Sequence, residues 1–227
     1  MSREIVLDTE TTGLEPSAGH RLVEIGCVEL INYIPSGRFF HTYINPEREV
    51  PKEAHNIHGL SYDFLKDHPS FKEIVHSFLE FIEEDPLVIH NAKFDMKFLN
   101  AELERLGLPE LPSSRAIDTL AMARKKFPGS PASLDALCKK WGVDNTAREK
   151  HGALLDAELL SQVYLELIGG KQPGLSLHFS SDEKENVDSE TMGYKTHRLA
   201  RAHQPTQEEL DLHHTLLGKL KDPLWLR

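Results

Sequence analysis

The sequence predicts an α/β protein in which helices flank a mixed β-sheet and a polar tail follows the folded domain. The first third of the chain is rich in β-branched and aromatic residues and is divided by Gly, Pro and Asn. From about residue 70 onward, apolar residues recur at helical spacing, with a short apolar run between two of the predicted helices. Strands followed by alternating helix and strand are typical of a mixed sheet with helices on its faces.

Three strands are expected in the first third of the chain. β-branched and aromatic residues dominate each run, and turn-forming residues separate one run from the next. The predicted strands are Glu4–Asp8, Leu22–Leu30 and Phe39–Ile44.

The first long helix is predicted at Phe71–Ile82, where apolar residues recur three and four positions apart. Ser70 and Glu73 have the spacing of a capping box at its start. A short buried strand is expected next at Leu87–His90. Further helices are predicted at Lys93–Leu106, which Gly107 closes, and at Ile117–Lys126, Leu134–Trp141 and Leu154–Ile168.

The composition changes after Gly169 and Gly170. Ser180–Thr191 is charged and poor in apolar residues, which indicates a flexible linker. Glu208–Leu220 carries leucines on a partly helical pattern and precedes Trp225. A short amphipathic helix cannot bury itself alone, so this end is expected to dock on a partner; the alternative is that it folds back on its own domain. The predicted parts are a catalytic domain, a linker region and a docking segment, at residues 1–170, 171–205 and 206–227.

Charge limits the classes of function that fit this chain. The net charge is -10, and residues 171–227 hold eight Lys and Arg against nine Asp and Glu, which leaves about -9 in residues 1–170. Binding long stretches of duplex through phosphates needs Lys and Arg, so the acidic balance argues against it. An acidic domain instead suits a site that holds cations and grips only the end of a strand.

Composition also predicts a cytoplasmic protein. Hydrophobic residues make up 39% of the chain and charged residues 27%, which is ordinary for a globular protein. The chain has no apolar run near the ~20 residues that span a bilayer, and the first residues lead into a strand without a signal peptide. Cys27 and Cys138 each lie alone in an apolar stretch, so we expect reduced, partly buried thiols.

The clearest chemical feature is DTETTG, residues 8–13, at the end of the first predicted strand. Residues two apart in a strand face the same side, so Asp8 and Glu10 can present two carboxylates to one point. Carboxylate oxygens at a strand end are good ligands for hard divalent cations. The alternative for this hexapeptide alone is a turn with solvated acids.

Two further clusters combine histidine with aspartate. HNAKFD, residues 90–95, stands where a strand gives way to a helix, and HGALLD, residues 151–156, precedes the last helix of the domain. Residues five apart on one helix diverge by roughly 140°, so we expect His151 in the loop before the helix and Asp156 on it. Taken singly, Asp95 could merely complement its helix dipole, and His151 could be an ordinary loop histidine.

Taken together, the three clusters predict two-metal hydrolysis of a phosphodiester. Two divalent cations carry four positive charges, which four carboxylates balance, and such a pair clamps the attacking and leaving oxygens of an in-line displacement. A neutral histidine is suited to take the proton of the attacking water. The predicted metal ligands are Asp8, Glu10, Asp95 and Asp156, and the predicted base is His151.

DTETTG, HNAKFD and HGALLD resemble, in this order, the three motifs of the DEDDh (DnaQ-like) 3′→5′ exonucleases. The resemblance implies a ribonuclease H-like fold, Mg²⁺ or Mn²⁺ as cofactor and the same five catalytic positions, all filled here. Val50–Leu60 resembles the family's substrate-binding loop, which implies that Glu53 and His58 contact the terminal nucleotide. The resemblance also implies that Asp8, Glu10 and Asp156 face the substrate. Residues 118–120, 123–124 and 133–135 resemble helical segments with a scaffold role.

The tail resembles that of the proofreading exonucleases of bacterial replicative polymerases. Gln172, Leu175 and Leu177 fit the pattern by which bacterial proteins bind the sliding clamp (beta). The resemblance implies that the C-terminal segment binds the polymerase (alpha) subunit, and a small theta-like accessory subunit is a further expected partner. The expected substrate is a DNA 3′ end, in the cytoplasm and without a membrane partner.

Two other functions remain open at this point. One is a stand-alone exonuclease of RNA or oligonucleotides from the same superfamily. The other is an inactive binding module that keeps a nuclease fold, which a complete set of five catalytic residues disfavours.

Overall fold

A computed structural model describes residues 2–146, 150–170 and 205–219 of the chain. The chain divides into two compact units, Met1–Ser176 and Leu177–Arg227, and each is described by itself. Within the described residues, no helix is long and apolar enough to cross a membrane.

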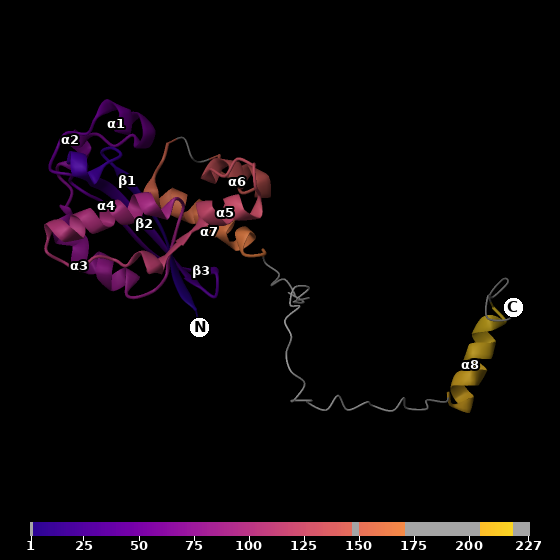
Figure 1. Ribbon diagram of the computed structural model, residues 1–227. Helices are drawn as coiled ribbons and strands as arrows, with labels where there is room; N and C mark the ends of the chain where they lie inside the picture. The colour runs from indigo at the N-terminus through magenta and orange to yellow at the C-terminus, as the bar shows by residue number, and fades with distance from the viewer. Residues whose placement is uncertain (1, 147–149, 171–204, 220–227) are drawn as a thin grey trace, which may run out of the picture. The chain divides into compact units, whose positions relative to one another are not determined.

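The first unit is built on a mixed sheet, as expected, and this sheet has five strands (Figure 1). The strand order is β3-β2-β1-β4-β5. β1 pairs with β2, and β2 with β3, in antiparallel fashion, whereas β4 runs parallel to both β1 and β5. The strands are β1 (Arg3–Thr11), β2 (Leu22–Ile31), β3 (Ile34–Tyr43), β4 (Leu87–Ile89) and β5 (Ala116–Asp118).

Seven α-helices are described in this unit. α3 begins with the expected capping box, in which Ser70 and Glu73 satisfy each other's backbone N–H groups. The helices are α1 (Lys52–His58), α2 (Tyr62–Leu65), α3 (Phe71–Ile82), α4 (Ala92–Arg105), α5 (Thr119–Lys126), α6 (Leu134–Trp141) and α7 (Ala153–Leu167). Two 3₁₀ turns lie at Pro16–Ala18 and Ser113–Arg115.

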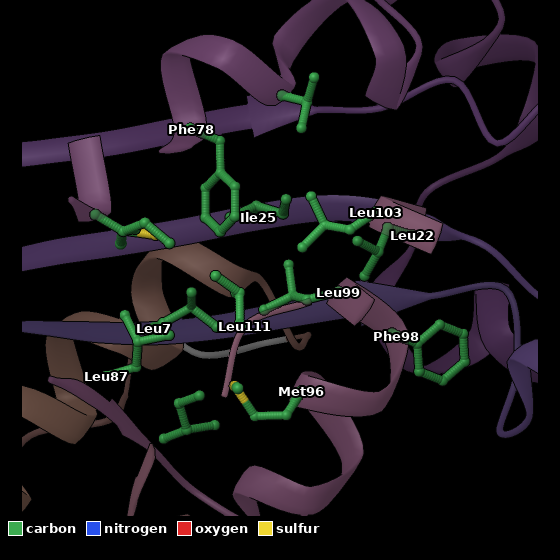
Figure 2. Close-up of a cluster of buried hydrophobic side chains, with 14 of the residues drawn as sticks. Leu7, Leu22, Ile25, Phe78, Leu87, Met96, Phe98, Leu99, Leu103 and Leu111 are labelled. Carbon is green, nitrogen blue, oxygen red and sulfur yellow. The ribbon is translucent and has the colours of Figure 1, made fainter. Parts of the chain in front are cut away.

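Helices cover both faces of the sheet because its central strand is apolar on both sides. On β1, Ile5 and Leu7 point into a core formed with α3 and α4, and Val6 points into a second core formed with α6 and α7. Figure 2 shows the first core, where Leu7, Leu22 and Ile25 meet side chains of α3 and α4 such as Phe78 and Leu99. Full burial of a large apolar side chain contributes roughly 1.5–3 kcal/mol to the stability of the fold, relative to leaving that side chain exposed.

Several predicted elements differ from the structure in their bounds, and two of these differences have a clear physical reason. The expected helix Ile117–Lys126 begins only at Thr119, because Ala116–Asp118 forms β5 and Asp118 caps the helix by accepting hydrogen bonds from the N–H groups of Leu120 and Ala121. Three residues are too few to display a strand period. The third strand begins at Ile34 and not Phe39, since an edge strand tolerates the Pro and Gly that precede Phe39.

The expected substrate-binding loop is largely a helix. Residues 52–58 form α1, and Gly59 ends it in the left-handed conformation at φ 78°. Seven residues are too short to form a helix by propensity alone, so packing against the rest of the unit stabilises α1.

The second unit contributes one described helix, α8 (Gln207–Leu217), which Thr206 and Glu209 begin with a capping box. Leu212 and Leu216 are exposed on it. Leu220 and Trp225, which the sequence assigns to the same docking segment, lie outside the described residues.

Both cysteines are fully buried. Burial raises the pKa of the Cys27 thiol far above its usual range. The Cys27 thiol is therefore not suited to nucleophilic chemistry.

Candidate active site

The first two acidic residues project from the C-terminal half of β1. Asp8 and Glu10 continue the i, i+2 series of Val6, so they face the side of the sheet that α7 covers. Both line one cavity of about 460 Å³. The spacing in DTETTG therefore places two carboxylates on one face, as expected.

Asp95 reaches the same cavity from the first turn of α4. Asn91, in the left-handed conformation at φ 68°, precedes the helix and turns the chain sharply after β4. The Thr9 hydroxyl donates a 2.7 Å hydrogen bond to Asp95 Oδ1, and both residues are buried. Burial raises the pKa of Asp95 to about 7, and the Thr9 hydrogen bond partly counters that shift.

His151 and Asp156 lie on either side of the start of α7. Gly152 is the extended N-cap residue, so His151 belongs to the preceding loop and Asp156 to the helix, as expected for two residues five apart that reach one site. His151 Nδ1 lies 3.3 Å from Asp156 Oδ2, with the histidine side chain 47% exposed and the aspartate buried. The backbone N–H of His151 donates to the carbonyl of Ile57, which ties this loop to α1.

A glycine in β2 determines how close α7 lies to β1, the strand that carries Asp8 and Glu10. Gly26 is paired directly with Asp8, and a Cβ at position 26 would lie 2.3 Å from backbone atoms of Ala153 and Leu154. Only glycine leaves room for the first turn of α7 at this point. That contact brings Asp156 to the carboxylates of β1.

The five predicted catalytic residues therefore line a single cavity. Ligand atoms of Glu10, His151 and Asp156 all lie within 4.8 Å of one another, which makes them a candidate metal-binding group. Carboxylate oxygens dominate the lining, and this donor set fits hard divalent cations. The lining carboxyl groups are those of Asp8, Glu10, Asp95, Asp135 and Asp156.

The sequence predicts only a scaffold role for two of the residues that line the cavity. Arg124 of α5 and Asp135 of α6 both border the same cavity. Their position depends on how α5 and α6 pack beside the strand ends. Local sequence around either residue carries no signal of that proximity.

A second cavity of about 590 Å³ adjoins the first, with Thr9, Glu10 and Phe94 lining both. The two residues expected at the terminal nucleotide, Glu53 and His58, line this second cavity from α1. His58 is only 6% exposed, and its Nδ1 accepts a 3.0 Å hydrogen bond from the N–H of Leu60. Burial lowers the pKa of His58 to about 4, so the ring is neutral at physiological pH.

The expected clamp-binding residues Gln172, Leu175 and Leu177 lie outside the described residues.

Comparison with known proteins places this site in a family. The model of the exonuclease family (RNase T) matches residues 5–164, which span all five predicted catalytic positions. The DNA polymerase III subunit epsilon of Rickettsia felis is 52% identical over 221 residues, covering 96% of this chain and 96% of that protein. The DNA polymerase III subunit epsilon of Escherichia coli is 45% identical over 179 residues, covering 75% and 73% of the two chains.

Solved structures agree in fold. Exonuclease X in complex with 5′ overhanging duplex DNA is similar with a TM-score of 0.58 and 25% identity, over 73% of this chain and 90% of that one. The nuclease domain of 3′hExo, a DEDDh family member bound to rAMP, shares the fold with a TM-score of 0.64 at 19% identity, over 74% and 92% of the chains. The chain belongs to the exonuclease family, in the branch formed by the epsilon subunits of DNA polymerase III.

Proposed function

We propose that the chain is the 3′→5′ exonuclease that removes mismatched nucleotides from DNA 3′ ends as the proofreading subunit of DNA polymerase III. One observation carries this proposal above the others. Five chemically suited residues from β1, α4 and the start of α7 line one cavity, and a second cavity of a size to hold a nucleotide adjoins it.

In this proposal Asp8, Glu10, Asp95 and Asp156 hold two divalent cations, Mg²⁺ or Mn²⁺. Such cations, when bound, neutralise charge on the scissile phosphate and favour ionisation of a bound water. The protein's own contribution is to keep the carboxylates close together, through the Gly26 contact and the hydrogen bond from Thr9 to Asp95.

His151 acts as the general base. Its Nδ1 faces Asp156 Oδ2 at 3.3 Å, so the neutral ring with a proton on Nδ1 has its lone pair on Nε2. Nε2 takes a proton from water, the water oxygen bonds to phosphorus, and the bond from phosphorus to the 3′ oxygen of the penultimate nucleotide breaks. That oxygen takes up a proton from solvent, and His151 releases to solvent the proton it received. The products are a nucleoside 5′-monophosphate and a strand shortened by one nucleotide with a 3′ hydroxyl.

The terminal nucleotide is proposed to bind in the second cavity. Glu53 and His58 of α1 line it, and Phe94 offers an aromatic ring on the wall that both cavities share. Asp8, Glu10 and Asp156 face the same nucleotide from the catalytic side. The backbone N–H of His151 donates a hydrogen bond to the carbonyl of Ile57 in α1. Ile57 also lines the second cavity, so this hydrogen bond links the proposed base to the proposed nucleotide cavity.

The partners are proposed from the tail and from the relatives. Residues 1–170 form the catalytic part, residues 171–205 carry the clamp-binding residues Gln172, Leu175 and Leu177, and residues 206–227 bind the polymerase (alpha) subunit. The Rickettsia relative named as an epsilon subunit aligns over 96% of this chain, so most of the tail is shared with it. A theta-like subunit is a further proposed partner, in a replisome that works in the cytoplasm.

A matched pair of variants tests the mechanism. Glu10→Gln keeps the shape of the side chain but removes a charge from the catalytic cavity, whereas Glu110→Gln makes the same change at an exposed loop position. We expect kcat for a mismatched DNA 3′ end with Mg²⁺ to fall by about 100-fold or more in the first variant and to stay unchanged in the second. Wild-type kcat in the Glu10→Gln protein overturns the proposal.

The substrate is tested with matched DNA, mismatched DNA and RNA 3′ ends, with Mg²⁺ or Mn²⁺, in the presence and absence of the polymerase subunit. Preferential removal of mismatched DNA ends, increased by the polymerase subunit, supports proofreading. A preference for RNA that the polymerase subunit leaves unchanged supports the stand-alone RNA exonuclease instead.

A further inference from the structure

We propose that Arg124 binds the phosphate immediately 5′ of the scissile phosphodiester, and so selects substrates that continue as a nucleic-acid strand. The inference deepens the proposed function and rests on it. It adds a contact for an internal phosphate, which the five catalytic residues do not supply.

The position of Arg124 indicates which part of the strand it meets. The nucleotide cavity and the catalytic cavity share Thr9, Glu10 and Phe94, and Arg124 lines only the catalytic one. A strand with its last nucleotide in the nucleotide cavity and its scissile phosphate among the carboxylates must leave along the rest of the catalytic lining. Leu120 and Arg124 of α5 contribute to that part.

The charge of Arg124 is the second observation. Five carboxyl groups line the catalytic cavity, and Arg124 is the one Lys or Arg among its described lining residues. Among the described lining residues, Arg124 therefore supplies the one permanent positive charge that an incoming polyanion meets. A guanidinium suits this task because its fork of N–H donors matches two phosphate oxygens.

Arg124 is also available for a ligand. It is exposed, and within the described part of the chain no hydrogen bond or ion pair is formed by its side chain. Its neighbour Lys126 is used differently, since its Nζ donates to the carbonyls of Glu166 and Leu167 at the end of α7. The last turn of α5 also holds Lys125, so a favourable charge for the helix dipole remains without Arg124.

The test compares two substrates that differ only on the 5′ side of the scissile bond. One is a single-stranded oligodeoxynucleotide, and the other is the p-nitrophenyl ester of thymidine 5′-monophosphate, which has no internal phosphate. The full chain is assayed with Mg²⁺ as wild type, Arg124→Gln and Arg124→Lys, and Lys125→Gln serves as the control for loss of one exposed positive charge on α5.

For Arg124→Gln we expect KM for the oligonucleotide to rise about tenfold with kcat nearly unchanged, and both constants for the ester to match wild type. The slope of log KM against log salt concentration should fall by about 0.7, the value for one phosphate contact on a single strand. Arg124→Lys should recover part of the loss, and Lys125→Gln should stay within about twofold of wild type on both substrates.

A neutral methylphosphonate at one position identifies the phosphate. Placed immediately 5′ of the scissile bond, it should raise KM for wild type and leave KM for Arg124→Gln unchanged. Equal effects on both proteins overturn the assignment to this phosphate.

Other outcomes overturn the inference in distinguishable ways. Wild-type KM for the oligonucleotide in Arg124→Gln shows that the residue binds no phosphate. If Arg124→Gln raises KM for the ester as much as KM for the oligonucleotide, Arg124 contacts the scissile phosphate instead. That result overturns the inference but leaves the proposed function standing. Failure of the wild-type protein to cleave either substrate with Mg²⁺ or Mn²⁺ overturns the proposed function as well.

Discussion

At the scale of single residues, the buried carboxyl group of Asp95 shows how a neighbour can prepare a proposed metal ligand. Burial favours its protonated form, and the Thr9 hydroxyl bonded to Oδ1 favours the charged form that a cation needs. We expect Thr9→Val, which removes the hydroxyl at nearly constant volume, to raise the Mg²⁺ concentration for half-maximal activity by about tenfold or more. Titrating activity against Mg²⁺ measures this effect.

Thr9→Ser is the matched control, because it keeps the donor and should keep the metal dependence near that of wild type. Identical Mg²⁺ titrations for Thr9→Val and wild type would show that the hydrogen bond does not support a metal ligand.

His58 makes stability depend on pH. Its pKa is about 4 in the folded protein, against an ordinary value near ~6.5 in the unfolded chain. Between these values the unfolded state binds the extra proton, so the free energy of unfolding is undiminished above about pH 6.5 and decreases as pH falls toward 4. We expect His58→Asn to weaken this decrease, as measured by urea unfolding at pH 7, 6, 5 and 4.

Both proteins share the other titrating groups, so the difference between their unfolding free energies at each pH reports on His58 alone. Parallel curves of unfolding free energy against pH for the two proteins would mean that His58 is not the neutral, buried ring described here.

At the scale of elements, the packing of α7 on β2 is the feature that aligns the site. A Cβ at position 26 would lie 2.3 Å from α7 backbone, which is far inside contact distance, so the helix must move. A shift of about 1 Å in catalytic groups can cost 100-fold in rate, and overpacking costs roughly 1–3 kcal/mol of stability. We expect Gly26→Ala to lower kcat by about 100-fold and to lower the free energy of unfolding, as measured by kinetics and urea denaturation.

Gly152→Ala provides the contrast for that variant. Gly152 lies beside His151, the proposed base, but its backbone is extended at φ -150° and a Cβ there would meet nothing within 4 Å. Its stability should match wild type and its kcat should stay within a few-fold. If the two alanine variants behaved alike, the close approach of α7 to β2 would not be what positions Asp156.

At the scale of the whole molecule, the acidic balance limits how well the protein can hold DNA unaided. With a net charge of -10, we expect its own affinity for a polyanion to be weak, and the proposed tether to a polymerase would replace that affinity by effective concentration. We expect the isolated protein to act distributively on primed DNA at physiological salt. The polymerase subunit should raise its rate, and a chain shortened to residues 1–170 should lose that increase while keeping kcat on short oligonucleotides.

Measured processivity that is already high without the polymerase subunit would contradict the tethering argument. So would a shortened chain that the polymerase subunit still stimulates.

The sequence by itself determined the features that depend on neighbouring residues. The bounds of α3 followed from the repeat and capping box of residues 70–82, and the i, i+2 spacing of Asp8 and Glu10 placed both carboxylates on one face. The break at Gly152 likewise separated His151 from the helix of Asp156. These signals are local because side-chain direction in a helix or strand repeats within a few residues.

Only the tertiary structure decided which segments meet. It replaced an expected loop by α1, inserted the three-residue strand β5, and brought Arg124 of α5 to the catalytic cavity. Residues 8, 95 and 156 come together because β4 pairs beside β1 and because Gly26 admits α7 against β2. Such contacts join residues far apart in the chain, so they depend on strand order and close packing, which no local spacing encodes.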